Sequence, residues 1–320
     1  MSSSKIAKDI ARIGRTDVEG VMMILSPAKT LDLSPYKPPS GKSFPAPTDP
    51  SCDSAKTTAV AVAMKARKEK DLEKLLKISS NLAKTSRKYW VDFKPDPSDR
   101  VDGGKKPALF AFSGAAYQGL EAPTLSERAV GYLQSNLRIV DPLYGSLRPM
   151  DLIQPYRLEM ATKGALAKGE MGDAKDLARW WRASVTESIG ADLGGREVGS
   201  RLVANLASDE YSAAIDPLSL PKGTAYVKVV FQQEGRVISV HAKRARGLMV
   251  RYIAENQVED IEGMRRFDSE GYRFVKGRSE ENHLVFDRPK QTPMKGKKKA
   301  ITTISGGVAS SQKKRTRQKR

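Results

Sequence analysis

Apolar residues along this chain form short continuous runs separated by stretches of helical spacing, which indicates strands and helices in one folded region. Val21–Leu25 is a continuous apolar run with the length of a buried strand. Val237–His241 is predicted to be a further strand, with Glu234-Gly235 as the turn of a hairpin. Strands are also predicted at Ala108–Phe112, Leu202–Leu206 and Ala225–Phe231.

Helical spacing of apolar residues predicts the remaining elements. Ala55–Trp90 is the most helix-prone region and has a break near Ile78. Further helices are predicted at Leu125–Val140, Leu177–Ile189 and Arg244–Asn256. Because strands and helices intermix without a regular βαβ repeat, the pattern favours a single, irregular mixed α/β domain of the α+β class.

The net charge of +19 is concentrated at the carboxyl end of the 320 residues. Residues 288–320 contain twelve basic and no acidic side chains, residues 1–20 carry +1, and the part between them carries +6. We therefore predict an appended arm at 1–20, a domain at 21–288 and a disordered basic tail at 289–320. Such a tail favours binding to polyanions, and nuclear localisation if the host is eukaryotic.

Composition excludes several classes of protein. No apolar stretch approaches the roughly 18–20 residues that cross a bilayer, so no membrane partner is predicted. Cys52 is the single cysteine, which excludes an internal disulfide and a cysteine-based zinc site and fits the reducing cytoplasm. With only His241 and His283 as histidines, we predict no metal site and no cofactor.

The segment Leu72–Ala83 has the apolar pattern of the helix-hairpin-helix element of nonspecific DNA-binding proteins. Its apolar positions are occupied by Leu72, Leu75, Ile78 and Ala83. The start of its second helix offers free backbone N–H groups and a favourable helix dipole to a phosphate. The predicted DNA-binding residues are Lys77, Ser79, Ser80, Lys84, Arg87 and Lys88. The alternative is a kinked amphipathic helix with a solvated basic face.

Polar side chains next to predicted strands form a second group. Ser26 and Lys29 follow the first strand with the spacing of a nucleophile and its activating base. Acids, cations and a tyrosine together are typical of a small-molecule or nucleotide site. The predicted cleft residues are Ser26, Lys29, Tyr156, Arg157, Asp209, Glu210, Lys243 and Arg246. The alternative is a set of turns, helix caps and solvated lysines.

A basic cluster of Lys243, Arg244 and Arg246 lies at the predicted start of the last helix. Cations in that position oppose the helix dipole at a cost of roughly 0.3–1 kcal/mol each, so we predict that they face an anion. His241, in the preceding predicted strand, is interpreted as a core or cleft histidine and not as a metal ligand.

Several longer motifs in one order carry a resemblance to a known family over residues 22–288. They are Leu25–Asp32, Leu143–Gly145 with Leu147–Pro149, Gln154–Met160, Asn205–Tyr211, Ala242–Met249 and Ser269–Tyr272. In these motifs the chain resembles the YaaA family of peroxide-stress proteins. The sequence departs from the family pattern at Asp141-Pro142, where relatives tend to have a Ser-Gly pair.

The resemblance implies a single α+β domain with a central cleft, the YaaA-type cantaloupe fold, containing a helix-hairpin-helix element. It also implies a basic cleft that binds DNA, and protection against hydrogen peroxide through less iron-driven DNA damage.

Two functions follow from these observations. The first is a DNA-binding stress protein without turnover, which holds duplex or branched DNA mainly through its phosphates. The second is an enzyme that acts on a small anionic or nucleotide-like ligand in the polar cleft. A tail-driven polyanion binder is a third alternative.

Overall fold

The computed structural model describes residues 20–94, 104–172 and 174–290. The predicted amino-terminal arm and basic tail therefore lie, apart from Gly20, Pro289 and Lys290, outside the described residues. Their boundaries and the disorder of the tail stay predictions.

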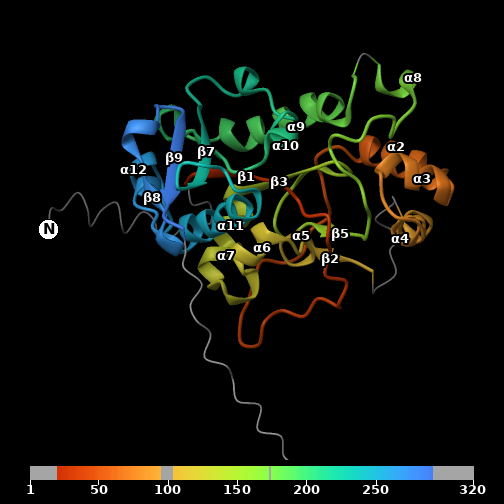
Figure 1. Ribbon diagram of the computed structural model, residues 1–320, viewed down its shortest axis with the longest axis horizontal. Helices are drawn as coiled ribbons and strands as arrows, with labels where there is room; N and C mark the ends of the chain where they lie inside the picture. The colour runs from red at the N-terminus through yellow and green to blue at the C-terminus, as the bar shows by residue number, and fades with distance from the viewer. Residues whose placement is uncertain (1–19, 95–103, 173, 291–320) are drawn as a thin grey trace, which may run out of the picture. The chain divides into compact units, whose positions relative to one another are not determined.

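A seven-stranded sheet runs through the domain in the order β4-β3-β1-β6-β7-β9-β8 (Figure 1). Its strands are β1 (Met22–Leu25), β3 (Leu137–Asp141), β4 (Gly145–Leu147), β6 (Leu202–Asn205), β7 (Ala225–Gln233), β8 (Arg273–Phe274) and β9 (His283–Arg288). The five central strands are parallel, and β4 and β8 are added antiparallel at the two edges. A separate antiparallel pair joins β2 (Lys106–Pro107) to β5 (Leu152–Ile153).

The central strand β1 lies between β3 and β6, with Met23 opposite Leu137 on one side and Ala204 on the other. Every residue of β1, β3 and β6 is buried. Strands covered on both faces lose the polar alternation of a half-exposed strand, which explains the continuous apolar runs of β1 and of Leu202–Ala204 in β6.

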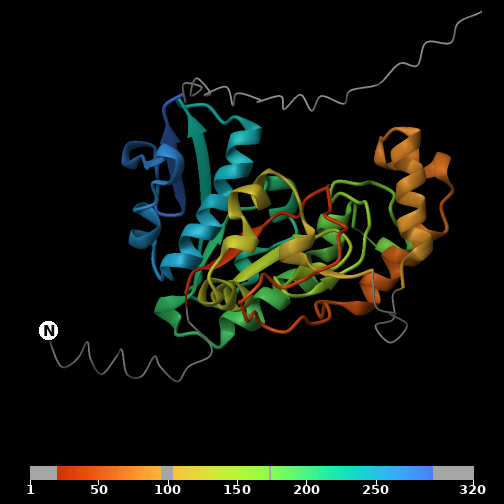
Figure 2. The same cartoon turned by 90° about the horizontal axis from the view of Figure 1, so that it is seen from below.

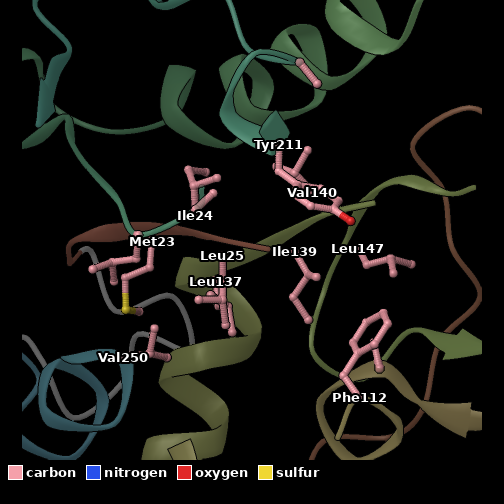
Figure 3. Packing of buried hydrophobic residues seen from close by; sticks show 14 of the residues in the cluster. Met23, Ile24, Leu25, Phe112, Leu137, Ile139, Val140, Leu147, Tyr211 and Val250 are labelled. Atoms are coloured by element: carbon pink, nitrogen blue, oxygen red, sulfur yellow. The ribbon is translucent and has the colours of Figure 1, made fainter. Parts of the chain in front are cut away.

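Helices cover both faces of the central strands. The helices of the described residues are α2 (Ser54–Lys65), α3 (Glu69–Leu76), α4 (Ser80–Asp92), α5 (Ala108–Ala111), α6 (Ala115–Leu120), α7 (Glu127–Asn136), α8 (Lys168–Met171), α9 (Leu177–Gly194), α10 (Asp209–Ser212), α11 (Ser239–Asn256) and α12 (Ile261–Arg265). In Figure 1, α9 and α10 lie on one side of β1 and β3, and α6, α7 and α11 on the other. Figure 3 shows the same two layers from close by, with Val250 of α11 near Met23 and Tyr211 beside Val140.

The helices α6 and α11 pack at unusually short range because glycines face one another. A Cβ atom added at Gly247 would lie 1.7 Å from the carbonyl oxygen of Ala116, and one at Gly119 would lie 2.2 Å from the carbonyl oxygen of Arg244. Real Cβ contacts are never so short, so only glycine allows this backbone approach. The contact fixes α11 against the segment that follows β2.

At one end of the domain α3 and α4 form a hairpin, which lies on the right of Figure 2. The helix α3 ends at Leu76 and is followed by Lys77, its C-cap, whose φ of 51° is left-handed. The Ile78 N–H donates to the Glu73 carbonyl oxygen at 3.2 Å. This is the hydrogen bond of a Schellman C-cap. The hydroxyl of Ser79 then accepts from the Leu82 N–H at 3.4 Å and begins α4. The turn thus has three residues, 77–79.

The structure corrects the predicted strand at Ala108–Phe112. Ala108–Ala111 forms the short helix α5, and Phe112 takes part only in an isolated bridge to Leu31. A five-residue apolar run has no period that separates a buried strand from one buried helical turn. Here the Ala108 N–H donates to the Asp151 carbonyl oxygen and starts the turn.

Two helix boundaries are also corrected. The predicted helix at Leu125–Val140 ends at Asn136, and Leu137–Asp141 is the strand β3, as its β-branched Ile139 and Val140 favour. The predicted strand at Val237–His241 is wrong, because α11 begins at Ser239. The turn at Glu234-Gly235 is present, with φ of 51° and 76°.

The prediction of a single mixed α/β domain is confirmed. Its sheet is more regular than expected, because four of the six strand pairings are parallel. The order β3-β1-β6 reverses direction at β1, so the strand ends next to β1 form a topological switch point. Ligands of parallel α/β sheets bind outside the carboxyl ends of the strands at such a point.

Candidate functional site

The carboxyl ends of β1 and β6 bring two predicted segments together. Ser26 directly follows β1, and the N–H of Ser208, three residues after β6, donates to the Ser26 hydroxyl at 3.0 Å. On the other side of the same loop, the Tyr117 hydroxyl donates to the Ser26 carbonyl oxygen at 3.1 Å. The loop after β1 is therefore fixed at the switch point by contacts from β6 and α6.

Lys29 is turned away from Ser26. Its ammonium lies 2.7 Å from a carboxylate oxygen of Glu159, and within the described chain no hydrogen bond joins it to Ser26. The geometry thus does not form the pair of a serine nucleophile and an activating lysine that the spacing of Ser26 and Lys29 indicates.

The segment around Glu159 also contacts the loop after β6. A carboxylate oxygen of Glu210 accepts from the Ala161 N–H at 3.0 Å. Residues 159–161 are therefore attached to the end of β1 through Lys29 and to the end of β6 through Glu210. Three segments far apart in the sequence form one polar cluster at the carboxyl ends of the central strands.

Asp141, the last residue of β3, places a fully buried carboxylate at the carboxyl end of that strand. One of its oxygens accepts from the N–H groups of Leu143 at 2.8 Å and Tyr144 at 2.9 Å, and the other accepts from the Tyr156 hydroxyl. Burial raises the pKa of Asp141 to about 6 even though these hydrogen bonds lower it. Burial also raises the pKa of Tyr156 well above its usual value, so the phenol stays a donor.

Asp209 links the cluster to β7 and α11. Its carboxylate lies 2.7 Å from the Lys228 ammonium. Burial lowers the pKa of Arg246 on α11, and the negative charge of Asp209 opposes that shift. The Nε of Arg246 is buried without a partner in the described part of the chain, and so is the Nε of Arg157. A buried guanidinium N–H without an acceptor is a position where an anion would bind favourably.

Of the eight predicted cleft residues, Asp209 and Arg246 interact with each other through their charges. The described contacts of Ser26, Lys29, Tyr156 and Glu210 are to residues outside the predicted set, namely Ser208, Glu159, Asp141 and the Ala161 N–H. Lys243 is exposed on α11, and no contact among the described residues joins it or Arg157 to the others. Lys243, Arg244 and Arg246 also lie in the second turn of α11, because that helix begins at Ser239. The predicted dipole cost at the helix start therefore does not apply to them.

Two residues of the cluster were not predicted from the sequence. Glu159 lies within the motif Gln154–Met160, but its pairing with Lys29 depends on the fold. Asp141 had a visible signal, since it is an acid directly after the β-branched pair Ile139-Val140. That pair was interpreted as part of a helix, which concealed the strand end.

The α3–α4 hairpin carries the second group of predicted residues. Lys77, Ser79, Ser80, Lys84 and Lys88 are exposed, and Arg87 is half-buried. Two of the cations have partners: Arg87 donates to the Lys65 carbonyl oxygen at 2.7 Å, and Lys88 lies 3.3 Å from Asp92. Within the described residues Lys77 and Lys84 have no ion-pair partner.

A groove of about 490 Å³ lies between the hairpin and the polar cluster. Its polar lining consists of Lys74 and Lys77 from the hairpin, and of Glu159, Thr162 and Lys163 from the facing segment. Cations thus face one another across the groove, and the Glu159 carboxylate stands at its border with the cluster.

No group of three or more His, Cys, Asp or Glu side chains in the described ranges is placed to hold a metal ion. No described helix is both long enough and apolar enough to span a membrane.

The fold and the site define a single-domain, mixed α/β protein with a polar cluster at the strand ends beside a basic helical hairpin. The chain belongs to the family described as peroxide stress protein YaaA, whose model matches residues 21–278.

Relatives agree with this assignment over nearly their full length. A UPF0246 protein of Aliivibrio fischeri is 38% identical over 273 residues, which is 85% of this chain and 99% of the relative. One of Chromobacterium violaceum is 39% identical over 85% of this chain and 100% of its own length. One of Acaryochloris marina is 36% identical over 84% of this chain and 100% of its own length.

Proposed function

We propose that this protein binds DNA during the response to hydrogen peroxide and thereby limits iron-driven DNA damage in the cytoplasm. The family description supports the role in peroxide stress. The observation that carries DNA binding is the α3–α4 hairpin, whose exposed Lys77 and Lys84 have no ion-pair partner among the described residues. We further propose that the domain has a central cleft of the cantaloupe type and a helix-hairpin-helix element.

Three features of the hairpin support phosphate binding of the helix-hairpin-helix kind. Leu72 and Ala83 are fully buried and hold the two helices together. Lys77 adopts the left-handed conformation for which a glycine is usual. The hydroxyl of Ser79 occupies one N–H of the first turn of α4, so the N–H groups of Ser80 and Asn81 remain for a phosphate.

Charge around this turn favours the same ligand. Lys77 and Lys84 lie exposed on the hairpin, and Lys163 lines the same groove as Lys77 from the facing segment. Cations that neutralise DNA phosphates release counterions, and this supplies most of the nonspecific affinity. The proposed interface therefore reads little sequence and takes duplex or branched DNA.

Salt-dependent fluorescence anisotropy with a labelled duplex tests the proposal on the full chain. The double variant Lys77→Ala/Lys84→Ala should reduce the slope of log K against log salt by about 0.9 for each lost phosphate contact. The matched control is Lys222→Ala/Lys276→Ala, which removes two exposed lysines outside the hairpin. If the hairpin variant keeps the affinity and slope of the control, this interface is wrong.

A second function is supported by the unpartnered Nε atoms of Arg157 and Arg246. We propose as the alternative an enzyme or binding site for a small anionic, nucleotide-like ligand at the switch point. Titration calorimetry with inorganic phosphate and with adenosine monophosphate tests it. Arg246→Gln should weaken binding about tenfold or more, because a charge-assisted hydrogen bond is lost. Absence of binding by the unmodified protein would contradict this alternative.

A further inference from the structure

The groove between the hairpin and the polar cluster contains one carboxylate among several cations. Glu159 lines it together with Lys74, Lys77 and Lys163. Its carboxylate lies 2.7 Å from the ammonium of Lys29, which is the cation of the neighbouring strand end. The three groove lysines, in contrast, have no ion-pair partner within the described residues.

We propose that Glu159 determines where a nucleic-acid strand can lie, by excluding phosphate from the Lys29 end of the groove. The Glu159 carboxylate occupies the position beside Lys29 that a phosphate would otherwise take. It neutralises the charge of Lys29 and repels an incoming anion. A bound strand is thereby confined to the hairpin side, at Lys77 and Lys163. The inference rests on the proposed DNA binding and adds a specificity-determining residue to it.

The local geometry favours a carboxylate that stays in place. The backbone around it is held on both sides, because the Thr162 N–H donates to the Glu159 carbonyl oxygen at 3.0 Å and the Ala161 N–H donates to Glu210. Only the side chain of Glu159 is free to move, and 28% of it is exposed. A phosphate at Lys29 would lie next to the Glu159 carboxylate, and the two negative charges would repel each other.

Lys29 has the properties of a phosphate contact that is blocked. Its side chain is 56% exposed, so solvent and an anion both reach it. A surface ion pair is worth only about 0–1 kcal/mol, so the pairing with Glu159 is not needed for folding. Removing the charge of Glu159 without changing its size should therefore expose a functional cation.

Anisotropy titrations of the full chain against salt, with a labelled duplex, test the inference. Glu159→Gln should bind about two- to fivefold more tightly, the equivalent of one surface ion pair. Its slope of log K against log salt should become steeper by about 0.9, for the one phosphate that Lys29 gains. Lys29→Ala alone should leave the slope unchanged, and Lys29→Ala/Glu159→Gln should lose the gain in slope.

Matched controls separate this effect from general electrostatics and from misfolding. Glu210→Gln removes a neighbouring charge that does not line the groove and should leave the slope unchanged. Glu159→Asp keeps the charge and should show no gain. If Glu159→Gln has the slope of the unmodified protein, or if the gain persists without Lys29, the inference is wrong. The proposed DNA binding fails separately, when Lys77→Ala/Lys84→Ala has no effect.

Discussion

The polar cluster at the strand ends and the α3–α4 hairpin differ in how their charges are used. In the cluster Lys29 is paired with Glu159, Asp209 with Lys228, and the carboxylate of Asp141 is hydrogen-bonded and buried. On the hairpin Lys77 and Lys84 are exposed, and no acid pairs with them in the described chain. Charges that are already neutralised hold a structure in place, whereas free ones attract a polyanion.

The first prediction tests the packing that supports the polar cluster and leaves the hairpin unchanged. Gly247→Ala places a Cβ 1.7 Å from the Ala116 carbonyl oxygen, so α11 must move away from α6. We expect a loss of about 3 kcal/mol or more in the free energy of unfolding, measured with urea, because overpacking against backbone does not relax easily.

The control for that variant is another glycine in a helix. Gly131 on α7 has nothing within 4 Å of an added Cβ, so Gly131→Ala should stabilise the protein by roughly 0.5–1 kcal/mol. Equal stability of Gly247→Ala and the unmodified protein would show that the α6–α11 contact is not as close as described.

The second prediction uses the buried carboxylate of Asp141. Its folded pKa of about 6 lies above the ordinary value of 3.8, so stability from its protonation is complete below pH 3.8 and lost as the pH rises through 6. Asp141→Asn has no such dependence. From pH 4 to pH 7 its free energy of unfolding should therefore improve, relative to the unmodified protein, by about 2 kcal/mol.

Urea unfolding at several pH values measures this difference. Asp209→Asn is the matched control, because its carboxylate is 81% exposed and should give no comparable change. Parallel pH profiles for Asp141→Asn and the unmodified protein would contradict the buried, hydrogen-bonded carboxylate.

How far the sequence predicts each region also differs. The strands β1, β6 and β7 and the helix α9 were predicted from their apolar runs and helical spacing, although the runs of β1 and β6 are no longer than Ala108–Phe112. Ala108–Phe112 and Leu137–Val140 were assigned to the wrong class of element, since short apolar runs fit a strand or a helical turn equally well. Because the segment that forms β3 was assigned to a helix, the sequence did not predict the mostly parallel sheet.

For the candidate site, the sequence indicates residue types and the fold decides their partners. Ser26 and Lys29 have the spacing of a catalytic pair, yet Lys29 contacts Glu159, which lies 130 positions away. The hairpin residues were easier to place because their geometry is local, and Lys77, Ser79 and Lys84 have the exposure expected of them. Arg87 is the exception, since its guanidinium caps α2 at the Lys65 carbonyl oxygen.

A third prediction separates stability from charge at the hairpin. Ser79→Ala removes the cap of α4 and should lower the free energy of unfolding by about 1 kcal/mol. Ser79→Asp keeps a capping oxygen and should retain stability, but its negative charge should weaken DNA binding. Urea unfolding and anisotropy on both variants measure the two effects. Unchanged DNA affinity in Ser79→Asp would place the phosphate elsewhere.

The smallest effect is expected at Cys52, which lies in neither region. A protein of peroxide stress with one cysteine suggests a thiol that reacts with peroxide, but the environment argues against it. Burial raises the pKa of Cys52 to about 11, and its thiol donates to the Ser184 carbonyl oxygen at 3.6 Å. Because the thiolate is the reactive form, only about one molecule in 10⁴ is reactive at pH 7. Cys52→Ser should therefore leave survival in hydrogen peroxide unchanged in cells that depend on this protein. If a Cys52→Ser variant of normal stability lost protection, the function would depend on the Cys52 thiol and not on the polar cluster or the hairpin.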